Sequence, residues 1–364
     1  MTRPRRDAHS EATFPPSDTP PGRGALFAVL ALATFLGLVA LIGSGPGLPG
    51  AGPGTAPGLN APGSTAASTP RSPEVLAPTA SGPAPAPPLA PLTILPGTVL
   101  TARDTLPGGR HRVFGGSQFL VAYYGTAGTG SLGTLGETGV DTAHERLMRA
   151  ARPFRRDGET IQPVYELIVT VADAIPGPGR DFSHDIARRL VEPYVRAAHR
   201  HGALLLLDLQ PGRTDFLTVA RRWEWALRDP WVGLALDPEW RMGRREVPGR
   251  VIGRVGAAEV NRTSAWLARL THRFDLPEKL FVLHQFRSSM LRDPAAIRER
   301  KGLAMVQHVD GFGTPRQKLS TYHSVARPRQ FAMGFKLFYD EDRRRMRAGA
   351  VRAIEPPVRF VSFQ

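Results

Sequence analysis

The chain of 364 residues contains no cysteine. This absence excludes disulfides, thiolate metal sites, a cysteine nucleophile and a lipid-modified N-terminal cysteine. Several catalytic motifs are missing as well, among them the Gly-x-Ser-x-Gly elbow of serine hydrolases and the His-Glu-x-x-His of zinc proteases. The glycine-rich segment 125–130 lacks the spacing of a phosphate-binding loop, so it is interpreted as a flexible loop.

Acidic residues are scarce relative to basic ones, and the formal net charge is +15. Residues 1–97 hold five Arg and four acidic residues, whereas the remainder holds 42 basic and 28 acidic residues, or +14. Nearly all the basic side chains are Arg, an excess that GC-rich codon usage also produces. The functional interpretation is attraction to an anionic surface, such as a cell-wall polymer, lipid head groups or nucleic acid.

The N-terminal part predicts a membrane anchor. Residues 1–24 form a polar basic tail, and residues 25–43 are an uncharged apolar run of about 19 residues, long enough to span a bilayer as a helix. A signal-peptide core is usually shorter, at about 7–15 residues, and no clear cleavage site follows the run, which favours an uncleaved anchor. The arginines before the run place the N-terminus in the cytoplasm and the rest outside, which argues against nucleic acid as a partner.

Residues 44–97 are rich in Pro, Gly, Ala, Ser and Thr and nearly free of charge. Such a composition cannot bury a hydrophobic core, so this segment is predicted to be a disordered tether. The extracytoplasmic domain is then expected to comprise residues 98–364.

This domain shows a regular alternation of strand-like and helix-like segments. Eight near-continuous apolar segments are predicted strands: 119–125, 161–171, 203–210, 231–240, 279–286, 303–312, 331–340 and 358–364. Between them lie predicted helices near 140–156, 181–201, 214–228, 256–274, 288–300, 314–327 and 341–352. The number and size of these units predict an α/β fold, a single (β/α)8 TIM-type barrel, with an open doubly wound sheet as the alternative. The closing helix is either absent or replaced by the segment before the first strand.

Nearly every predicted strand ends with a polar or ionisable side chain. These are Tyr124, Glu166, Asp208, Gln210, Asp237, Glu239, His284, His308, Asp310, Lys336 and Tyr339. Each would cost several kcal/mol if buried without partners, so we expect them to meet in one polar pocket at the carboxyl end of the barrel. Lys336 and Tyr339 differ in parity along their strand, so at most one of the two points inward.

Two of these acids are candidates for catalysis. Asp237 and Glu239 are two residues apart and project together if the strand continues that far. Two carboxylates are the minimum for glycoside hydrolysis, in which one protonates the leaving oxygen. Glu239 is the expected general acid, assisted by Asp237, because Pro238 and Trp240 lower the polarity around it. The candidates for the second acid are Asp310, Asp208 and Glu166, and sugar CH groups could contact the aromatic faces of Tyr124, Trp240 and Tyr339.

The segment 234–240 (Leu-Ala-Leu-Asp-Pro-Glu-Trp) resembles the fourth-strand Asp-x-Glu of chitinase-type and lysozyme-type glycoside hydrolase barrels. The resemblance implies that Glu239 is the proton donor and that Asp237 assists it. The further upstream acids of the chitinase motif are Val232 and Ala235 here, so catalysis assisted by a substrate acetamido group is not implied. Segments 208–213, 283–286 and 308–312 also resemble a family of membrane-anchored proteins of high-GC Gram-positive bacteria without an established activity.

The sequence therefore predicts a membrane-anchored, extracytoplasmic, glycoside-hydrolase-like protein that acts on cell-envelope polysaccharide without a cofactor. One alternative is a non-catalytic barrel that binds wall polymer. Another is a metal-dependent hydrolase, since His and carboxylate side chains suit several divalent ions, with the candidate ligands Asp237, His284, His308 and Asp310. Arg213 and Arg241 could bind an anionic substituent, although solvated loop arginines are the commoner case. The oligomeric state is left open.

Overall fold

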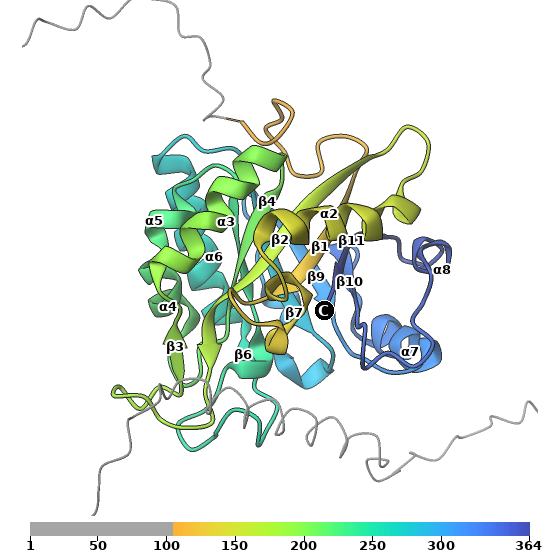
Figure 1. Cartoon of the computed structure of the whole chain (residues 1–364). Coiled ribbons are helices and arrows are strands. Elements are labelled where there is room, and N and C mark those ends of the chain that lie inside the picture. The colour runs from red at the N-terminus through yellow and green to blue at the C-terminus, as the bar shows by residue number, and fades with distance from the viewer. Residues whose placement is uncertain (1–104) are drawn as a thin grey trace, which may run out of the picture. The chain divides into compact units, whose positions relative to one another are not determined.

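The computed structural model describes residues 105–364, which form a closed barrel of eight parallel strands (Figure 1). The strands are β1 (Gln118–Gly125), β2 (Thr160–Ala172), β4 (Leu204–Leu209), β5 (Val232–Leu236), β7 (Lys279–Gln285), β9 (Leu303–Val309), β10 (Ala332–Leu337) and β11 (Val358–Phe363). The barrel closes because β11 pairs with β1, from Leu120 opposite Phe360 to Tyr123 opposite Phe363. The predicted TIM-type barrel is confirmed, and the alternative of an open sheet is wrong.

The predicted membrane helix (25–43) and tether (44–97) lie outside the described residues. Within residues 105–364, no helix is both long enough and apolar enough to cross a bilayer.

The helices of the outer layer are α2 (Val140–Ala151), α3 (Arg188–His201), α4 (Phe216–Arg222), α5 (Glu224–Leu227), α6 (Ala257–Arg273), α7 (Pro315–Val325) and α8 (Ala348–Arg352). They pack on the strands through one large cluster of buried apolar side chains. The first residues of the predicted helix 181–201 instead form β3 (Ser183–Asp185), which pairs antiparallel with the end of β2. The helix predicted over 341–352 is confined to its last turn.

The helix predicted over 288–300 is wrong. This segment forms two 3-10 turns, η5 (Ser288–Met290) and η6 (Pro294–Ala296), separated by β8 (Leu291–Arg292). Asp293 has a left-handed φ of 53°, and Pro294 disfavours a helical residue before it and supplies no N–H. The segment pairs instead with β6 (Val255–Gly256), so a short two-stranded sheet lies beside the barrel.

The strand predicted over 231–240 ends at Leu236, earlier than expected. Asp237 begins the 3-10 turn η4 (Pro238–Trp240), where its Oδ1 accepts a hydrogen bond of 3.1 Å from the Glu239 N–H. Pro238 cannot donate to a sheet, and a short acidic side chain competes with sheet pairing by bonding to nearby backbone. Asp237 and Glu239 are therefore neighbours through this turn and not through the pleat of a strand.

The segment before β1 closes the amino end of the barrel. Leu106 and Val113 are buried among the inward side chains of the amino-terminal half of the barrel, including Leu120, Leu206 and Phe360. In Figure 1 this segment is orange and lies at the upper end, while β3 and β6 lie at the opposite, carboxyl end. Within the described residues no helix follows β11, and the segment before β1 covers the barrel end without joining the outer ring. Because the interior of the amino-terminal half is filled by apolar side chains, polar side chains inside the barrel gather at its carboxyl end.

Candidate functional site

Polar side chains at the carboxyl ends of the eight barrel strands, or directly after them, replace the apolar core at that end of the barrel. Each of them is at most 7% exposed: Tyr124, Glu166, Asp208, Asp237, His284, His308, Asp310, Lys336 and Ser362. Along β4, β7 and β9 they continue the inward-facing positions of the apolar residues below them, such as Leu206, Val282 and Val306. We call these nine residues the polar cluster.

His284 on β7 lies at the centre of the polar cluster between two carboxylates. Its Nδ1 lies 3.0 Å from Asp310 Oδ2, and its Nε2 lies 3.0 Å from Glu166 Oε1 and 3.7 Å from Asp208 Oδ1. Burial lowers the pKa of His284, but the charges and hydrogen bonds of Glu166 and Asp310 outweigh burial and hold the pKa well above its usual value. The ring is therefore an imidazolium that neutralises part of the surrounding negative charge.

Tyr124 links β1 to β4 across the barrel. Its hydroxyl donates to Asp208 Oδ2 at 3.0 Å and accepts from Gln210 Nε2 at 3.3 Å. Gln210 is held in turn by the Ala172 N–H, which donates to its Oε1 at 3.1 Å. Burial raises the pKa of Asp208 to about 6, against the opposing effect of His284. Asp208 therefore changes its charge close to neutral pH.

Asp237, a member of the polar cluster, and Glu239 come directly after β5. Burial and the charge of Asp208 raise the pKa of Asp237 to about 8. Glu239 is partly exposed, and burial together with the charges of Asp237 and Asp310 raises its pKa well above the usual value. Both carboxyl groups therefore keep their protons to a higher pH than exposed carboxyl groups do, and Glu239 is the one that also meets solvent.

The main chain at Glu239 is held by a close backbone approach. The Gly253 N–H donates to the Glu239 carbonyl oxygen at 2.6 Å. A Cβ at position 253 would lie 2.5 Å from the carbonyl oxygens of both Glu239 and Pro238, so only glycine fits there. The long loop between β5 and α6 thus returns to fix the turn that carries Glu239.

Asp310 and His308 come from β9 and its continuation. Burial favours the neutral form of Asp310, but the hydrogen bond and charge of His284 outweigh it, and the pKa of Asp310 is lowered. His308 Nε2 lies 3.2 Å from Ser362 Oγ, and burial and the neighbouring His284 lower its pKa well below the usual value. Asp310 is therefore an ionised carboxylate and His308 a neutral ring.

The structure brings most of the predicted site residues together but leaves two of them elsewhere. Tyr339 lies outside the cluster, with its hydroxyl 3.2 Å from that of Tyr123 and its ring stacked on Phe363 at 5.5 Å. Lys336 and Tyr339 have opposite parity along the chain, and Lys336 is the one that points into the barrel, where its Nζ lies over the Tyr124 ring. Trp240 is buried at the end of η4, and its side chain takes no part in the polar contacts described above. Ser362 was missed, although its position two residues after the inward Phe360 places it on the same face of the last strand.

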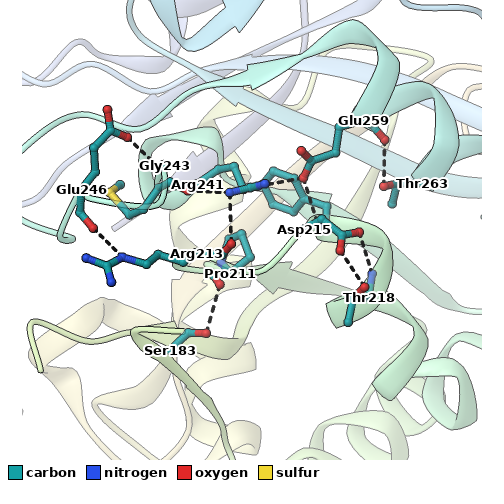
Figure 2. A network of polar contacts seen from close by, with 12 residues as sticks. Ser183, Pro211, Arg213, Asp215, Thr218, Arg241, Gly243, Glu246, Glu259 and Thr263 are labelled. Atoms are coloured by element: carbon teal, nitrogen blue, oxygen red, sulfur yellow. Dashed lines mark hydrogen bonds and ion pairs between the residues drawn. The ribbon is translucent and has the colours of Figure 1, made fainter. Parts of the chain in front are cut away.

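Arg213 and Arg241, considered as ligands for an anionic group, bond instead to the loops after β4 and β5 (Figure 2). Arg241 donates to Glu259 Oε1 at 2.9 Å and to the carbonyl oxygens of Arg213 and Met242. Arg213 donates from Nε to the Glu246 carbonyl oxygen at 2.9 Å, and its guanidinium lies 4.0 Å from the Phe182 ring centroid. These bonds fix the loop that carries Glu239.

Within residues 105–364, no group of three or more His, Asp and Glu side chains is arranged to hold a metal ion. The loop after β1 does contain the spacing Gly-x-Gly-x-x-Gly at 128–133, which begins three residues after the start of segment 125–130. There it forms 3-10 turns, and α2 begins only at Val140, so the motif does not open a helix as a dinucleotide cradle requires.

A comparison with known protein families finds none that matches the chain, and a search of curated proteins finds no match either.

Proposed function

We propose that this chain is a glycoside-hydrolase-like enzyme in which Glu239 is the proton donor. The observation that carries the proposal is that Glu239 follows β5 and Asp310 follows β9 at the carboxyl end of one TIM-type barrel, where the pKa of Glu239 is raised and that of Asp310 is lowered. Environments that separate the pKa values of two carboxyl groups are how glycosidases assign the acid and the anionic role. Such sites lie at the carboxyl ends of barrel strands.

In the proposed reaction Glu239 transfers the proton and Asp310 stabilises the developing charge. The Glu239 carboxyl gives its proton to the glycosidic oxygen as the bond to the anomeric carbon breaks, and water supplies the hydroxyl group to that carbon. Asp310 supplies the negative charge that stabilises the positive charge developing on the sugar ring, and its buried Oδ1 has no hydrogen-bond partner in the described part of the chain. The second water proton returns to Glu239, so the enzyme ends the cycle as it began.

Other members of the cluster position these two groups. His284 holds Oδ2 of Asp310 and leaves Oδ1 free, and Asp237 fixes the backbone of Glu239. Asp208 and Glu166 remain candidates for a second carboxylate or for binding sugar hydroxyls.

We further propose that residues 25–43 anchor the protein in a lipid bilayer and that residues 44–97 tether the barrel outside the membrane. The support is the length and apolarity of the run, the arginines before it and the charge-poor composition after it. This topology makes cell-envelope polysaccharide the proposed substrate.

The test is Glu239→Gln in the full-length chain, with release of reducing ends from purified wall glycans as the readout. Removing a general acid is expected to lower release about 100-fold or more. Glu145→Gln, at an exposed position on α2, is the matched control and should leave release unchanged. If the parent chain binds wall glycan but releases no sugar from any preparation, the non-catalytic polymer-binding alternative holds.

A further inference from the structure

The loops that follow β9 and β10 are joined into one unit beside the polar cluster. The Arg343 N–H donates to the Gly313 carbonyl oxygen at 3.2 Å, and the Gly313 N–H donates to Asp342 Oδ1 at 3.1 Å. Asp342 also accepts from the Phe338 N–H at 3.0 Å and pairs with the buried Lys318 Nζ at 2.9 Å. These bonds hold the backbones of the two loops together, so the exposed side chains of the loops have fixed relative positions.

This unit exposes an aromatic ring close to the proposed reaction centre. Phe312 is 38% exposed and follows Asp310 by two residues. Its ring meets that of Phe338 edge-on at 5.8 Å, and Lys336 Nζ lies 5.5 Å from the Phe338 centroid. The face of a sugar ring is apolar enough to pack against an exposed aromatic ring of this kind.

The same unit exposes three consecutive arginines, Arg343, Arg344 and Arg345. None of the three forms an ion pair with a described residue, and the Arg345 guanidinium lies 4.3 Å from the Tyr339 ring centroid. Arg344 has a left-handed φ of 58°, a conformation that is uncommon for a non-glycine residue. The unit stays cationic despite Asp340 and Glu341, because Lys318 neutralises Asp342 and Arg347 adds a fourth arginine.

We propose that Phe312 and Arg343–Arg345 form a subsite for a negatively charged saccharide, which makes the substrate an anionic polysaccharide. The aromatic ring receives a sugar face, and the guanidinium groups bind its carboxylate or phosphate substituents. This inference rests on the proposed function, because it names the substrate class of the same site. It assigns the binding role to the arginines after β10 and not to Arg213 and Arg241, whose donors are engaged in loop bonds.

The experiment measures binding by the full-length chain to polygalacturonate, poly(glycerol phosphate) and a neutral N-acetylglucosamine oligosaccharide. Arg343→Gln/Arg344→Gln/Arg345→Gln and Phe312→Ala are the test variants. Arg149→Gln/Arg196→Gln/Arg269→Gln is the matched control, because it removes the same charge from exposed positions on α2, α3 and α6. Duplex DNA is included as another polyanion.

We expect the parent to bind one acidic polymer more tightly than the neutral oligosaccharide, and the polymer preferred identifies carboxylate or phosphate as the ligand. The triple variant should weaken this binding about tenfold while the control changes it less than about twofold. Equal losses in both triple variants, equal binding of the neutral oligosaccharide, or tighter binding of DNA would overturn the proposal. Binding is read without catalysis, so failure of the hydrolase proposal gives a separate result: polymer bound through these arginines but not cleaved.

Discussion

Lys336 Nζ lies 3.4 Å from the ring centroid of Tyr124, over the face of the ring that helps to hold Asp208. The contact places a cation from β10 among the carboxyl groups contributed by β4, β5 and β9. The positive charge of Lys336 lowers the pKa values of Asp208, Asp237 and Glu239, in opposition to the effect of burial. Lys336 therefore moves the ionisation of these three carboxyl groups to lower pH than burial and the neighbouring carboxylates alone would give.

Lys336→Met is predicted to move the pH profile of sugar release to higher pH. Methionine keeps most of the side-chain volume over Tyr124 but removes the charge, so the pKa values of Asp208, Asp237 and Glu239 rise further. Both limbs of the profile should shift upward, and the measurement is kcat/KM for wall-glycan cleavage as a function of pH. Lys336→Arg keeps the charge and is the control; an equal shift in both variants would show that packing, and not charge, sets the profile.

Asp237→Asn is predicted to stabilise the protein increasingly as the pH rises. The pKa of Asp237 is raised from 3.8 to about 8 in the folded state, so the folded chain binds more protons than the unfolded chain between these values. Its contribution to stability is present below about pH 4 and is lost as the pH rises towards 8, by up to about 1.4 kcal/mol per pH unit. Asparagine cannot ionise, and its Oδ1 can still accept from the Glu239 N–H.

Urea unfolding of the parent and Asp237→Asn at several pH values between 4 and 8 checks this prediction. The difference in unfolding free energy should grow across this range, while Asp340→Asn, at an exposed position, should show no such growth. A constant difference between Asp237→Asn and the parent at every pH would mean that Asp237 ionises in the fold as it does in water.

The barrel could be predicted because its strands carry their signal locally. Each strand is a short apolar run buried on both faces, and eight such runs in one domain leave few architectures. The helix expected over 288–300 failed because the left-handed Asp293 before Pro294 interrupts it and β8 then pairs with β6. That pairing joins segments more than 30 residues apart, so a local pattern cannot reveal it.

Members of the polar cluster could be predicted where every second residue of a regular strand points into the barrel. Inward positions on β4, β7 and β9 continue a two-residue period that can be read along the chain. The contacts within the cluster were not predictable, because they depend on barrel closure. The position of His284 between Glu166 and Asp310 joins β2 to β7 and to the end of β9. Tyr339 lay beyond the regular part of β10, where the period no longer applies.

Lys318→Met is predicted to destabilise the fold by about 3–5 kcal/mol, because it leaves the buried Asp342 carboxylate without its cation. Asp342 also accepts from the Gly313 and Phe338 N–H groups, so the loops after β9 and β10 should loosen together. Urea unfolding gives the loss, and hydrogen exchange of residues 311–313 and 338–343 gives its location. Lys318→Met combined with Asp342→Leu should recover part of the loss; if the double variant loses the sum of both single effects, the pair is not coupled.

Gly334→Ala is predicted to destabilise the barrel by about 1–3 kcal/mol through overpacking. A Cβ at position 334 would lie 2.4 Å from Cδ2 of His308, a ring that cannot easily move because Ser362 and Phe360 contact it. Gly349→Ala in α8 is the matched control, since its Cβ meets no atom within 4 Å and alanine favours a helix by up to about 1 kcal/mol. Urea unfolding should therefore separate the two substitutions in sign. If Gly334→Ala were as stable as the parent, the His308 ring would have room to move, and its contact with Ser362 would not be a fixed part of the cluster.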